Sequence, residues 1–333
     1  MDNLNIPSYK IRKKRVKSKF APSINSIENL IELGQSINLY ENIDMVMLWR
    51  ILPYLEELNN LIGMKNMKDS IFNQILYYIQ GMHLRNTDDE YLHTIIYGCP
   101  GTGKTTVAKI IAKIYKSMGI LSKNGIFKIA HRDDFVAGYL GQTAIKTQKL
   151  LESCIGGVLF IDEVYSLGSG QDDKDSFSKE AIDTIVSFLS EHTKDFCCIA
   201  AGYEEDIDKC FFSMNAGLES RFQWKHFIDK YNPQDLFNIF ISKIQNSKWE
   251  TTINEELFVK KIQEHLDSLF KNMGRDILSL ISKCKIVHSR RVFGLDSSHK
   301  FIITEEDLNN ALNLMKKNVK IVKKDLPPEH FYI

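Results

Sequence analysis

The sequence predicts an α/β fold, in which a parallel sheet is covered by helices, with an all-helical unit behind it and a short helical extension in front. Three observations support this prediction. Short apolar runs alternate with amphipathic stretches through the middle of the chain, a glycine-rich loop joins the first run to the first stretch, and beyond Pro233 the strand signals mostly fade. With 333 residues, of which 44% are hydrophobic, the chain can bury a substantial core and is long enough for two domains or for one large domain with appendages.

The amino-terminal segment contains a basic cluster at residues 10–19, which carries seven positive charges and no negative ones. Since the net charge of the chain is +1, the remaining residues carry a net charge of −6. Such a cluster can bind nucleic acid or act as a nuclear-import signal, and a solvated tail explains it equally well. Behind it, helical spacing of Ile, Leu and Met predicts helices at residues 26–33 and 45–58, an extension rather than an independent domain.

A turn at Gly63 then leads into an amphipathic helix that ends near residue 80, and from there strands alternate with helices. The expected strands lie at residues 92–97, 126–130, 158–161, 196–200 and 226–228. The expected helices between them lie at residues 105–118, 144–154 and 178–192. Short apolar strands separated by amphipathic helices indicate a parallel sheet that is covered on both faces.

Behind the sheet, amphipathic spacing predicts a run of helices. They are expected at residues 233–244, 255–269, 274–289 and 305–318. The predicted organisation is therefore a tail and helical extension at 1–57, an α/β domain at 58–231, a helical domain at 232–320 and a carboxy-terminal tail at 321–333.

The glycine-rich loop after the first strand of the sheet fits the pattern G-x-x-x-x-G-K-[ST] at every fixed position. It reads Gly98, Cys99, Pro100, Gly101, Thr102, Gly103, Lys104 and Thr105. Glycines leave no Cβ in the way, so backbone N–H groups can converge on phosphate oxygens while the following helix offers its positive end. Lys104 would reach the β and γ phosphates and the Thr105 hydroxyl would hold Mg²⁺. The loop therefore predicts a binder of a nucleoside triphosphate and Mg²⁺.

The strand at residues 158–161 ends in two adjacent acids, Asp162 and Glu163. In a phosphate-loop enzyme, Asp162 would hold water or Mg²⁺ next to Thr105, and Glu163 would orient and polarise the water that attacks the γ-phosphate. Taken alone, the acids are equally well explained as a solvated strand end. They follow Thr105 by 57 residues, with one strand and one helix between, and that spacing favours the catalytic interpretation.

Two arginines are candidates for stabilising charge on the transferred phosphate, because a guanidinium stays charged and can grip two oxygens. Arg221 precedes the last strand of the sheet, where it could project toward a neighbouring subunit, and Arg275 begins a helix of the helical unit. Taken singly, each is better explained as a surface arginine with a salt-bridge partner. Tyr139 and Leu140 lie in a glycine-flanked loop that suits contact with a partner, although from the residues alone we expect Tyr139 to fold back onto its own domain.

Together these residues resemble the AAA+ ATPases, and within them the CbbX/CfxQ subgroup, which includes SpoVK-like proteins and CfxQ-like proteins of large DNA viruses. The resemblance runs from about Leu58 to Leu314. It rests on the motifs GCPGTGKTT from Gly98 to Thr106, GGVLFIDEVYSL from Gly156, EAIDT from Glu180, AAGY from Ala200, NAGLESRF from Asn215 and GRD from Gly274.

The resemblance implies an ATP-hydrolysing α/β domain with a helical lid, assembled as a homo-oligomeric ring for which six subunits are expected. Catalysis is implied for Lys104, Glu163 and Arg221, the last as an arginine finger on a neighbour's ATP. Nucleotide binding is implied for residues 98–106, for Ile62 and Gly63 against adenine, and for Arg275 as a γ-phosphate sensor; Mg²⁺ is implied at Thr105 and Asp162, and a substrate-pulling pore loop at Tyr139 and Leu140.

The sequence departs from the family pattern at two places. Ala216 replaces the proline of the usual NPGL motif, which is expected to loosen the turn that aims Arg221. Gly202 and Tyr203 stand where many AAA+ relatives place a polar sensor asparagine.

The leading hypothesis is an ATPase motor that remodels a protein partner, gripping it with Tyr139. One alternative is a nucleic-acid-associated ATPase of helicase or loader type that uses residues 10–19, and another is a nucleotide-dependent scaffold. The chain has no apolar run long enough for a membrane span or a signal peptide, no C-x-x-C pair and no H-x-x-x-H pair. We therefore expect an intracellular, cytoplasmic protein with reduced cysteines and no membrane partner, and the basic cluster leaves a nuclear location open.

Overall fold

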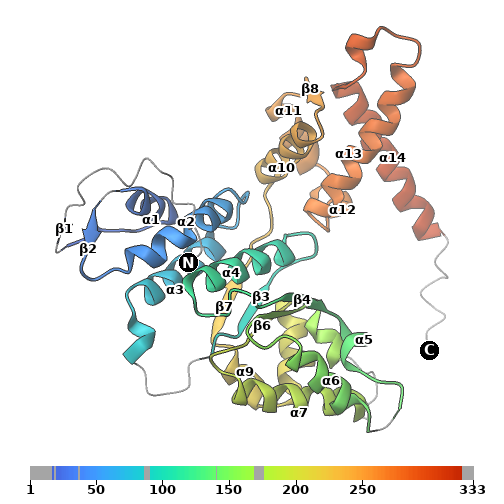
Figure 1. Cartoon of the computed structure of the whole chain (residues 1–333). Helices are drawn as coiled ribbons and strands as arrows, with labels where there is room; N and C mark the ends of the chain where they lie inside the picture. The colour runs from blue at the N-terminus through green and yellow to red at the C-terminus, as the bar shows by residue number, and fades with distance from the viewer. Residues whose placement is uncertain are drawn as a thin grey trace. The chain divides into compact units, whose positions relative to one another are not determined.

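Two compact units make up the chain (Figure 1). The computed structural model describes residues 17–18, 20–36, 38–85, 91–139, 141–168 and 176–324, with side chains up to residue 317 in the last helix. The first unit comprises residues 1–98 and 104–228, and the second comprises residues 99–103 together with 229–333.

A five-stranded parallel sheet forms the centre of the first unit, with its strands in the order β4-β5-β6-β3-β7. The strands are β3 (Thr94–Tyr97), β4 (Phe127–Ala130), β5 (Val158–Ile161), β6 (Cys197–Gly202) and β7 (Trp224–Phe227). The three central strands are buried along their whole length, which is why β5 and β6 appear in the sequence as continuous apolar runs and β3 as three apolar residues after Thr94. All five predicted strands are confirmed. β7 begins two residues earlier than predicted, because it is an edge strand with only His226 buried.

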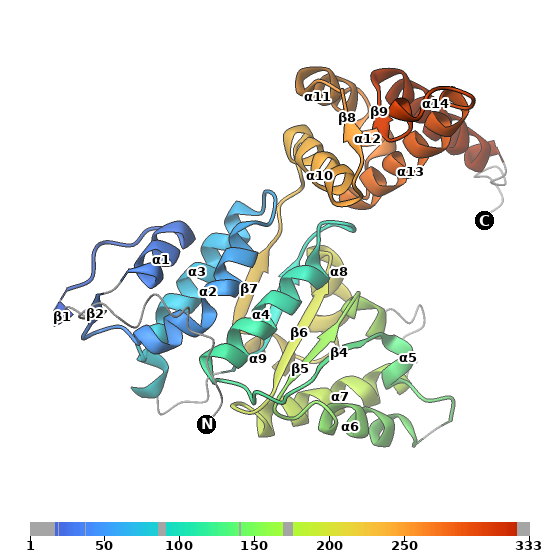
Figure 2. The same cartoon turned by 45° about the horizontal axis from the view of Figure 1, so that its top comes forward.

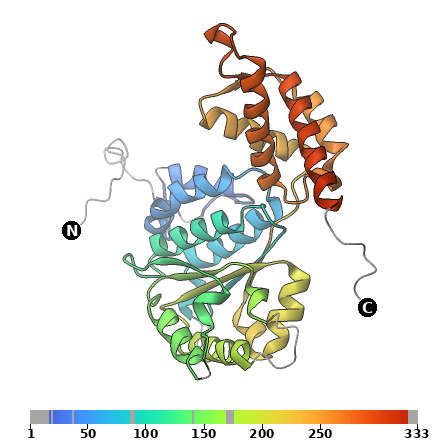
Figure 3. The same ribbon diagram turned by 90° about the vertical axis from the view of Figure 1, so that its right-hand side faces the viewer.

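Helices cover both faces of this sheet. They are α4 (Lys104–Met118), α5 (Arg132–Phe135), α6 (Thr143–Glu152), α7 (Ser176–Glu191), α8 (Glu204–Asp206) and α9 (Gly217–Arg221), with shorter helical turns η3 (Val164–Leu167), η4 (Ile207–Phe211) and η5 (Phe212–Met214). α4 lies over one face, and α6 and α7 lie over the other (Figures 1 and 3). The core on the second face joins Ile182, Ile185 and Phe188 of α7 to Leu159 and Ile161 of β5.

The amino-terminal extension belongs to the same compact unit as the sheet. Its elements are β1 (Lys17–Ser18), α1 (Ile27–Gln35), β2 (Leu39–Tyr40), α2 (Met45–Asn59), α3 (Lys65–Ile79) and η2 (Met82–Arg85). The predicted helices are confirmed, as is the turn at Gly63, where φ is +65°. α2 packs along α4, and Lys113 Nζ of α4 lies 2.8 Å from Glu57 Oε2 of α2. The extension therefore braces the helix that begins at the glycine-rich loop.

The second unit is mainly helical. It contains α10 (Pro233–Asn246), β8 (Glu250–Thr251), α11 (Glu255–Gln263), α12 (Leu266–Leu269), α13 (Gly274–Arg291), η6 (Ser297–His299), β9 (Ile302–Ile303) and α14 (Glu305–Lys324). Phe240, Phe258, Ile277 and Leu308 are fully buried in its core. A buried carboxylate, Asp307, ties α14 to α13 by accepting hydrogen bonds from Arg291 Nε and Nη2 at 2.9 Å each.

Two expectations about this unit are wrong. The single helix expected at residues 255–269 is broken at His265, whose φ of −127° is not helical and which begins α12 instead. The unit is also not entirely helical, because β8 and β9 pair in parallel (Figure 2). Two-residue strands are too short to leave an alternating pattern in the sequence. Within the described ranges, no helix has the length and apolar character that crossing a bilayer requires.

Candidate nucleotide-binding site

The glycine-rich loop connects the end of β3 to the start of α4, as the motif requires. Gly101 and Gly103 have φ angles of +72° and +94°, a region that other residues rarely adopt. The loop is closed by hydrogen bonds from Thr102 Oγ1 to Cys99 O at 2.7 Å and from Lys104 Nζ to Gly98 O at 2.8 Å. The amino end of α4 and the Lys104 ammonium thus meet at one compact loop, which is an arrangement suited to phosphate.

The tip of the loop, residues 99–103, belongs to the second compact unit, and the contacts that Thr102 and Gly101 make there explain this. Tyr231 donates a hydrogen bond to Thr102 O at 2.9 Å. A Cβ added to Gly101 would lie 2.1 Å from Asn272 O and 3.0 Å from the backbone nitrogen of Arg275. The predicted sensor Arg275 is therefore a backbone neighbour of the loop, at the amino end of α13, and its side chain is exposed.

The two predicted acids follow β5. Asp162 is half-buried and accepts a hydrogen bond from the backbone N–H of Glu163 at 3.1 Å, and Glu163 is exposed. The φ of Glu163 is +50°, a left-handed conformation that costs a glutamate on the order of 1 kcal/mol. Because β6 alone separates β5 from β3, the acids and the loop share the carboxyl edge of the sheet, roughly 10 Å apart across the strands.

Gly202 ends β6 and Tyr203 directly follows it, so both lie between the acids and the loop. Gly98 N–H donates to Gly202 O at 3.0 Å, which ties the first residue of the loop to this strand. The ring of Tyr203 lies 5.8 Å from Lys104 Nζ, measured to the ring centroid, and 6.1 Å from the ring of Tyr165. Sequence reasoning missed Tyr165, because only its position two residues after Glu163 could have pointed to it.

Arg221 lies far from this edge. It ends α9, three residues before Trp224, which pairs with Thr94 at the amino edge of the sheet. Its Nε donates to Ser190 Oγ at 2.8 Å and one Nη to Gly217 O at 2.5 Å. Burial lowers the pKa of the neighbouring His93 to about 4, and the Arg221 charge adds to that effect. The structure therefore separates Arg221 from the loop and acids of its own chain.

The turn that aims Arg221 is ordered without the proline of the usual motif. Asn215 Oδ1 accepts a hydrogen bond from Gly217 N–H at 2.9 Å, and Asn215 Nδ2 donates to Asp183 at the same distance. Ala216 has a φ of −58°, the value that a proline would impose. The Asn215 side chain therefore holds both sides of the turn, and the effect of Ala216 on it stays a prediction.

The remaining predicted residues lie in loops. Ile62 and Gly63 form the half-buried turn between α2 and α3. The side chain of Tyr139 is 74% exposed, so the expectation that it folds back onto its own domain is wrong. Leu140 lies outside the described residues, as does the basic cluster at 10–19 except for its strand residues 17 and 18.

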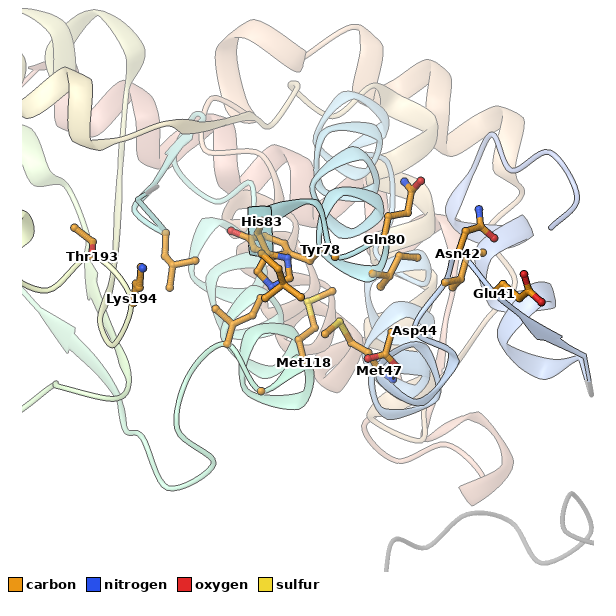
Figure 4. A pocket seen from close by; sticks show the side chains of 17 residues that line it. Glu41, Asn42, Asp44, Met47, Tyr78, Gln80, His83, Met118, Thr193 and Lys194 are labelled. Atoms are coloured by element: carbon orange, nitrogen blue, oxygen red, sulfur yellow. Dashed lines mark hydrogen bonds between the residues drawn. The ribbon is translucent and has the colours of Figure 1, made fainter. Parts of the chain in front are cut away.

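A cavity of about 740 Å³ lies at the opposite end of α4 from the loop (Figure 4). Its wall includes Met118 at the end of α4, Met47 of α2, Tyr78 of α3, His83 of η2, and Lys194 after α7. These residues adjoin the amino edge of the sheet, because Leu92, which precedes β3, also lines the cavity. The cavity is therefore separate from the candidate nucleotide site.

Comparison with known proteins identifies the family to which the chain is similar. The model of the ATPase family associated with various cellular activities (AAA) matches residues 94–229. A CfxQ-like protein of Acanthamoeba polyphaga mimivirus is 41% identical over 295 residues, which is 87% of this chain and 70% of that protein. Stage V sporulation protein K of Bacillus subtilis is 38% identical over 63% of this chain and 66% of its own length. The chloroplastic ribulose bisphosphate carboxylase/oxygenase activase of Cyanidioschyzon merolae is 30% identical over 78% of this chain and 88% of its own length.

Solved structures support the fold. The AAA domain of FIGL-1 in complex with ADP aligns with a TM-score of 0.52 at 15% identity, covering 81% of this chain and 85% of that one. A RuvB variant of Thermotoga maritima aligns with a TM-score of 0.53 at 17% identity, covering 77% and 71%.

Proposed function

The chain belongs to the AAA family of ATPases, within the CbbX/CfxQ subgroup, and we propose that it acts as a ring-forming motor that uses ATP hydrolysis to remodel a protein partner. The observation that supports this proposal is that the candidate catalytic residues lie at opposite edges of the sheet. The loop, Asp162 and Glu163 share the carboxyl edge, whereas Arg221 precedes the amino end of β7. An arginine finger at this position can complete only a site on a second copy of the chain, and in a closed ring every site has such a neighbour.

In this proposal, residues 98–106 bind the phosphates of ATP, Ile62 and Gly63 lie against the adenine, and Arg275 senses the γ-phosphate. Thr105 and Asp162 would hold Mg²⁺, since a hydroxyl and a carboxylate are the hard oxygen donors that this ion prefers. Bound there, the ion would neutralise phosphate charge.

Glu163 orients and polarises the attacking water in this mechanism. Its side chain is exposed, and its left-handed backbone holds it at the end of β5, so it is available to a water molecule on the carboxyl edge. Lys104 and the neighbour's Arg221 stabilise the charge that develops on the γ-phosphate.

The mechanical part of the proposal rests on Tyr139. A tyrosine that is 74% exposed between two glycines suits gripping of an extended polypeptide, because its ring offers apolar contact to any sequence. Added Cβ atoms at Gly138 and Gly141 would meet nothing within 4 Å, so space around the loop is open.

The chemical half is tested with Glu163→Gln, which keeps the shape of the side chain and removes its charge. We expect ATP affinity within a few-fold of the parent and turnover lower by a factor of about 10² to 10⁴. Binding is measured by equilibrium titration and turnover by phosphate release. Unchanged hydrolysis would remove Glu163 from the mechanism.

The mechanical half is tested with Tyr139→Ala. The Glu163→Gln ring with ATP first identifies the polymer that the ring retains. Tyr139→Ala should then hydrolyse ATP at the parental rate while remodelling of that polymer is lost, with Tyr139→Phe as the variant that retains function. If Tyr139→Ala remodels normally, gripping by this loop is excluded, and a retained polymer that is nucleic acid would favour the helicase or loader alternative.

A further inference from the structure

The aromatic face of Tyr203 is a neighbour of the phosphate-binding lysine. Tyr203 directly follows β6, the strand that separates the acids on β5 from the loop after β3. Lys104 Nζ lies 5.8 Å from the centroid of its ring, within the range of a cation–π interaction. The same ammonium donates a hydrogen bond to Gly98 O at 2.8 Å, so a carbonyl and an aromatic ring together restrain the position of the ammonium.

Tyr203 is itself held in place by its neighbours. The backbone N–H of Ile207 donates to Tyr203 O at 2.9 Å, and the ring of Tyr165 lies 6.1 Å away at an interplanar angle of 42°. Gly202 makes room for this pair, because a Cβ at that position would lie 2.8 Å from Tyr165 Cδ1. Gly202 at the end of β6 and Tyr203 directly after it therefore act together: the glycine leaves room for Tyr165, and the tyrosine faces Lys104.

Tyr165 connects this aromatic pair to the acids. It lies two residues after Glu163 in η3, and burial raises the pKa of its hydroxyl to about 12, with the nearby Glu163 charge adding to the effect. The hydroxyl is therefore neutral at physiological pH. Tyr165 packs on Tyr203 without adding a negative charge beside Lys104.

We propose that Tyr203 is a positioning residue for ATP hydrolysis, which holds the Lys104 ammonium through its aromatic face, with Tyr165 as the support of the ring. Lys104 has a long, flexible stem, and a ring face constrains its ammonium without neutralising it as a carboxylate would. The ammonium thus keeps its full charge for the phosphates. This inference rests on the ATPase activity of the family and is independent of any remodelled partner.

Two substitutions at Tyr203 separate the ring from the hydroxyl. Tyr203→Phe retains the aromatic face, and Tyr203→Leu keeps apolar bulk without it. In steady-state ATP turnover by the full chain without any partner, we expect Tyr203→Leu to lower kcat about ten-fold with KM for ATP changed less than about two-fold, and Tyr203→Phe to stay within about two-fold of the parent. A Tyr203→Leu variant with parental kcat, or a Tyr203→Phe variant as slow as Tyr203→Leu, would overturn the proposal.

Tyr54 of α2 supplies a matched control, because it contacts Lys113, a second lysine of α4. Its ring lies 5.9 Å from Lys113 Nζ, so Tyr54→Leu removes the same type of contact from α4 at a distance from the acids. We expect Tyr54→Leu to leave kcat unchanged, and an equal loss there would refute a specific role for Tyr203. Thermal unfolding of each variant shows whether it is folded. If Tyr203→Leu is poorly folded, Tyr203→Trp, which keeps an aromatic face, should retain turnover. A folded but slow Tyr203→Trp would contradict the proposal.

Discussion

The register of β3 and β7 places Arg221 too far from the phosphate loop to serve the ATP of its own chain. β3 and β7 pair from Thr94 opposite Trp224 to Tyr97 opposite Phe227, and the phosphate loop begins at Gly98, one residue further. Arg221 precedes Trp224, so about 13 Å of strand separates it from the loop, more than an arginine side chain spans. Any catalytic role for Arg221 therefore requires a second subunit.

The perturbation that tests this is a mixture of two inactive variants. Arg221→Ala keeps Glu163 and lacks the finger, whereas Glu163→Gln keeps the finger and lacks the water-orienting acid. We expect each alone to lose turnover, Arg221→Ala by a factor of about 10³. In an equimolar ring, a site is complete when an Arg221→Ala subunit faces a Glu163→Gln subunit, which holds for about a quarter of the interfaces and should restore about a quarter of parental turnover.

The assay is phosphate release after the two variants are mixed and allowed to exchange subunits before ATP is added. Mixing Glu163→Gln with the double variant should restore nothing. Ser190→Ala is the matched control for local structure, because it removes the 2.8 Å bond to Arg221 Nε while keeping the guanidinium, and should retain turnover to within a few-fold. Parental turnover by Arg221→Ala alone, or no recovery in rings that exchange subunits, would refute the reasoning.

Three further predictions concern stability and the loop. Gly101→Ala should abolish nucleotide binding, because its Cβ would lie 2.1 Å from a backbone carbonyl oxygen, and it should lower the free energy of unfolding by well over the roughly 1 kcal/mol that a left-handed alanine costs. The control is Gly119→Ala, where φ is +82° and nothing lies within 4 Å of the added Cβ, and which should cost only about 1 kcal/mol. Denaturant titration measures both costs, and equal costs would contradict the steric argument. Ala216→Pro should stabilise the chain by about 0.4 to 1 kcal/mol, since its φ of −58° suits proline, and a lower melting temperature would show that the turn needs the N–H. Burial works to raise the pKa of Asp307, but hydrogen bonds from Arg291 and other donors outweigh it and lower the pKa to about 2 from 3.8. The stabilisation, about 2 kcal/mol, should be complete above about pH 5 and be lost as the pH falls through about 2. Hydrogen exchange in α13 and α14 measures it, and Asp307→Asn with the parental pH dependence would rule it out.

Much of the fold was predictable because its signals are local. The buried strands β5 and β6 are continuous apolar runs, β3 is apolar from residue 95 to residue 97, and the loop after β3 carries its glycines and lysine at fixed spacing. The roles proposed for Lys104, Asp162 and Glu163 follow from the same local patterns, since a parallel sheet brings the carboxyl ends of its strands to one edge.

Other features depend on contacts between segments that are distant in the sequence. The start of β7 is decided by pairing with Thr94, and the pairing of β8 with β9 joins residues about 50 positions apart. The break at His265 likewise left no proline or glycine to mark it. The periodicity of one segment cannot show these features, because each depends on contacts with another segment of the chain.

The sequence by itself determined that this chain binds and hydrolyses ATP, because that chemistry is written in contiguous motifs. Only the tertiary structure decided which of the proposed catalytic residues share an edge of the sheet. It separates Arg221 from the loop by the length of a strand and brings the ring of Tyr203 to Lys104, and both results follow from the order and register of parallel strands, which no single segment encodes.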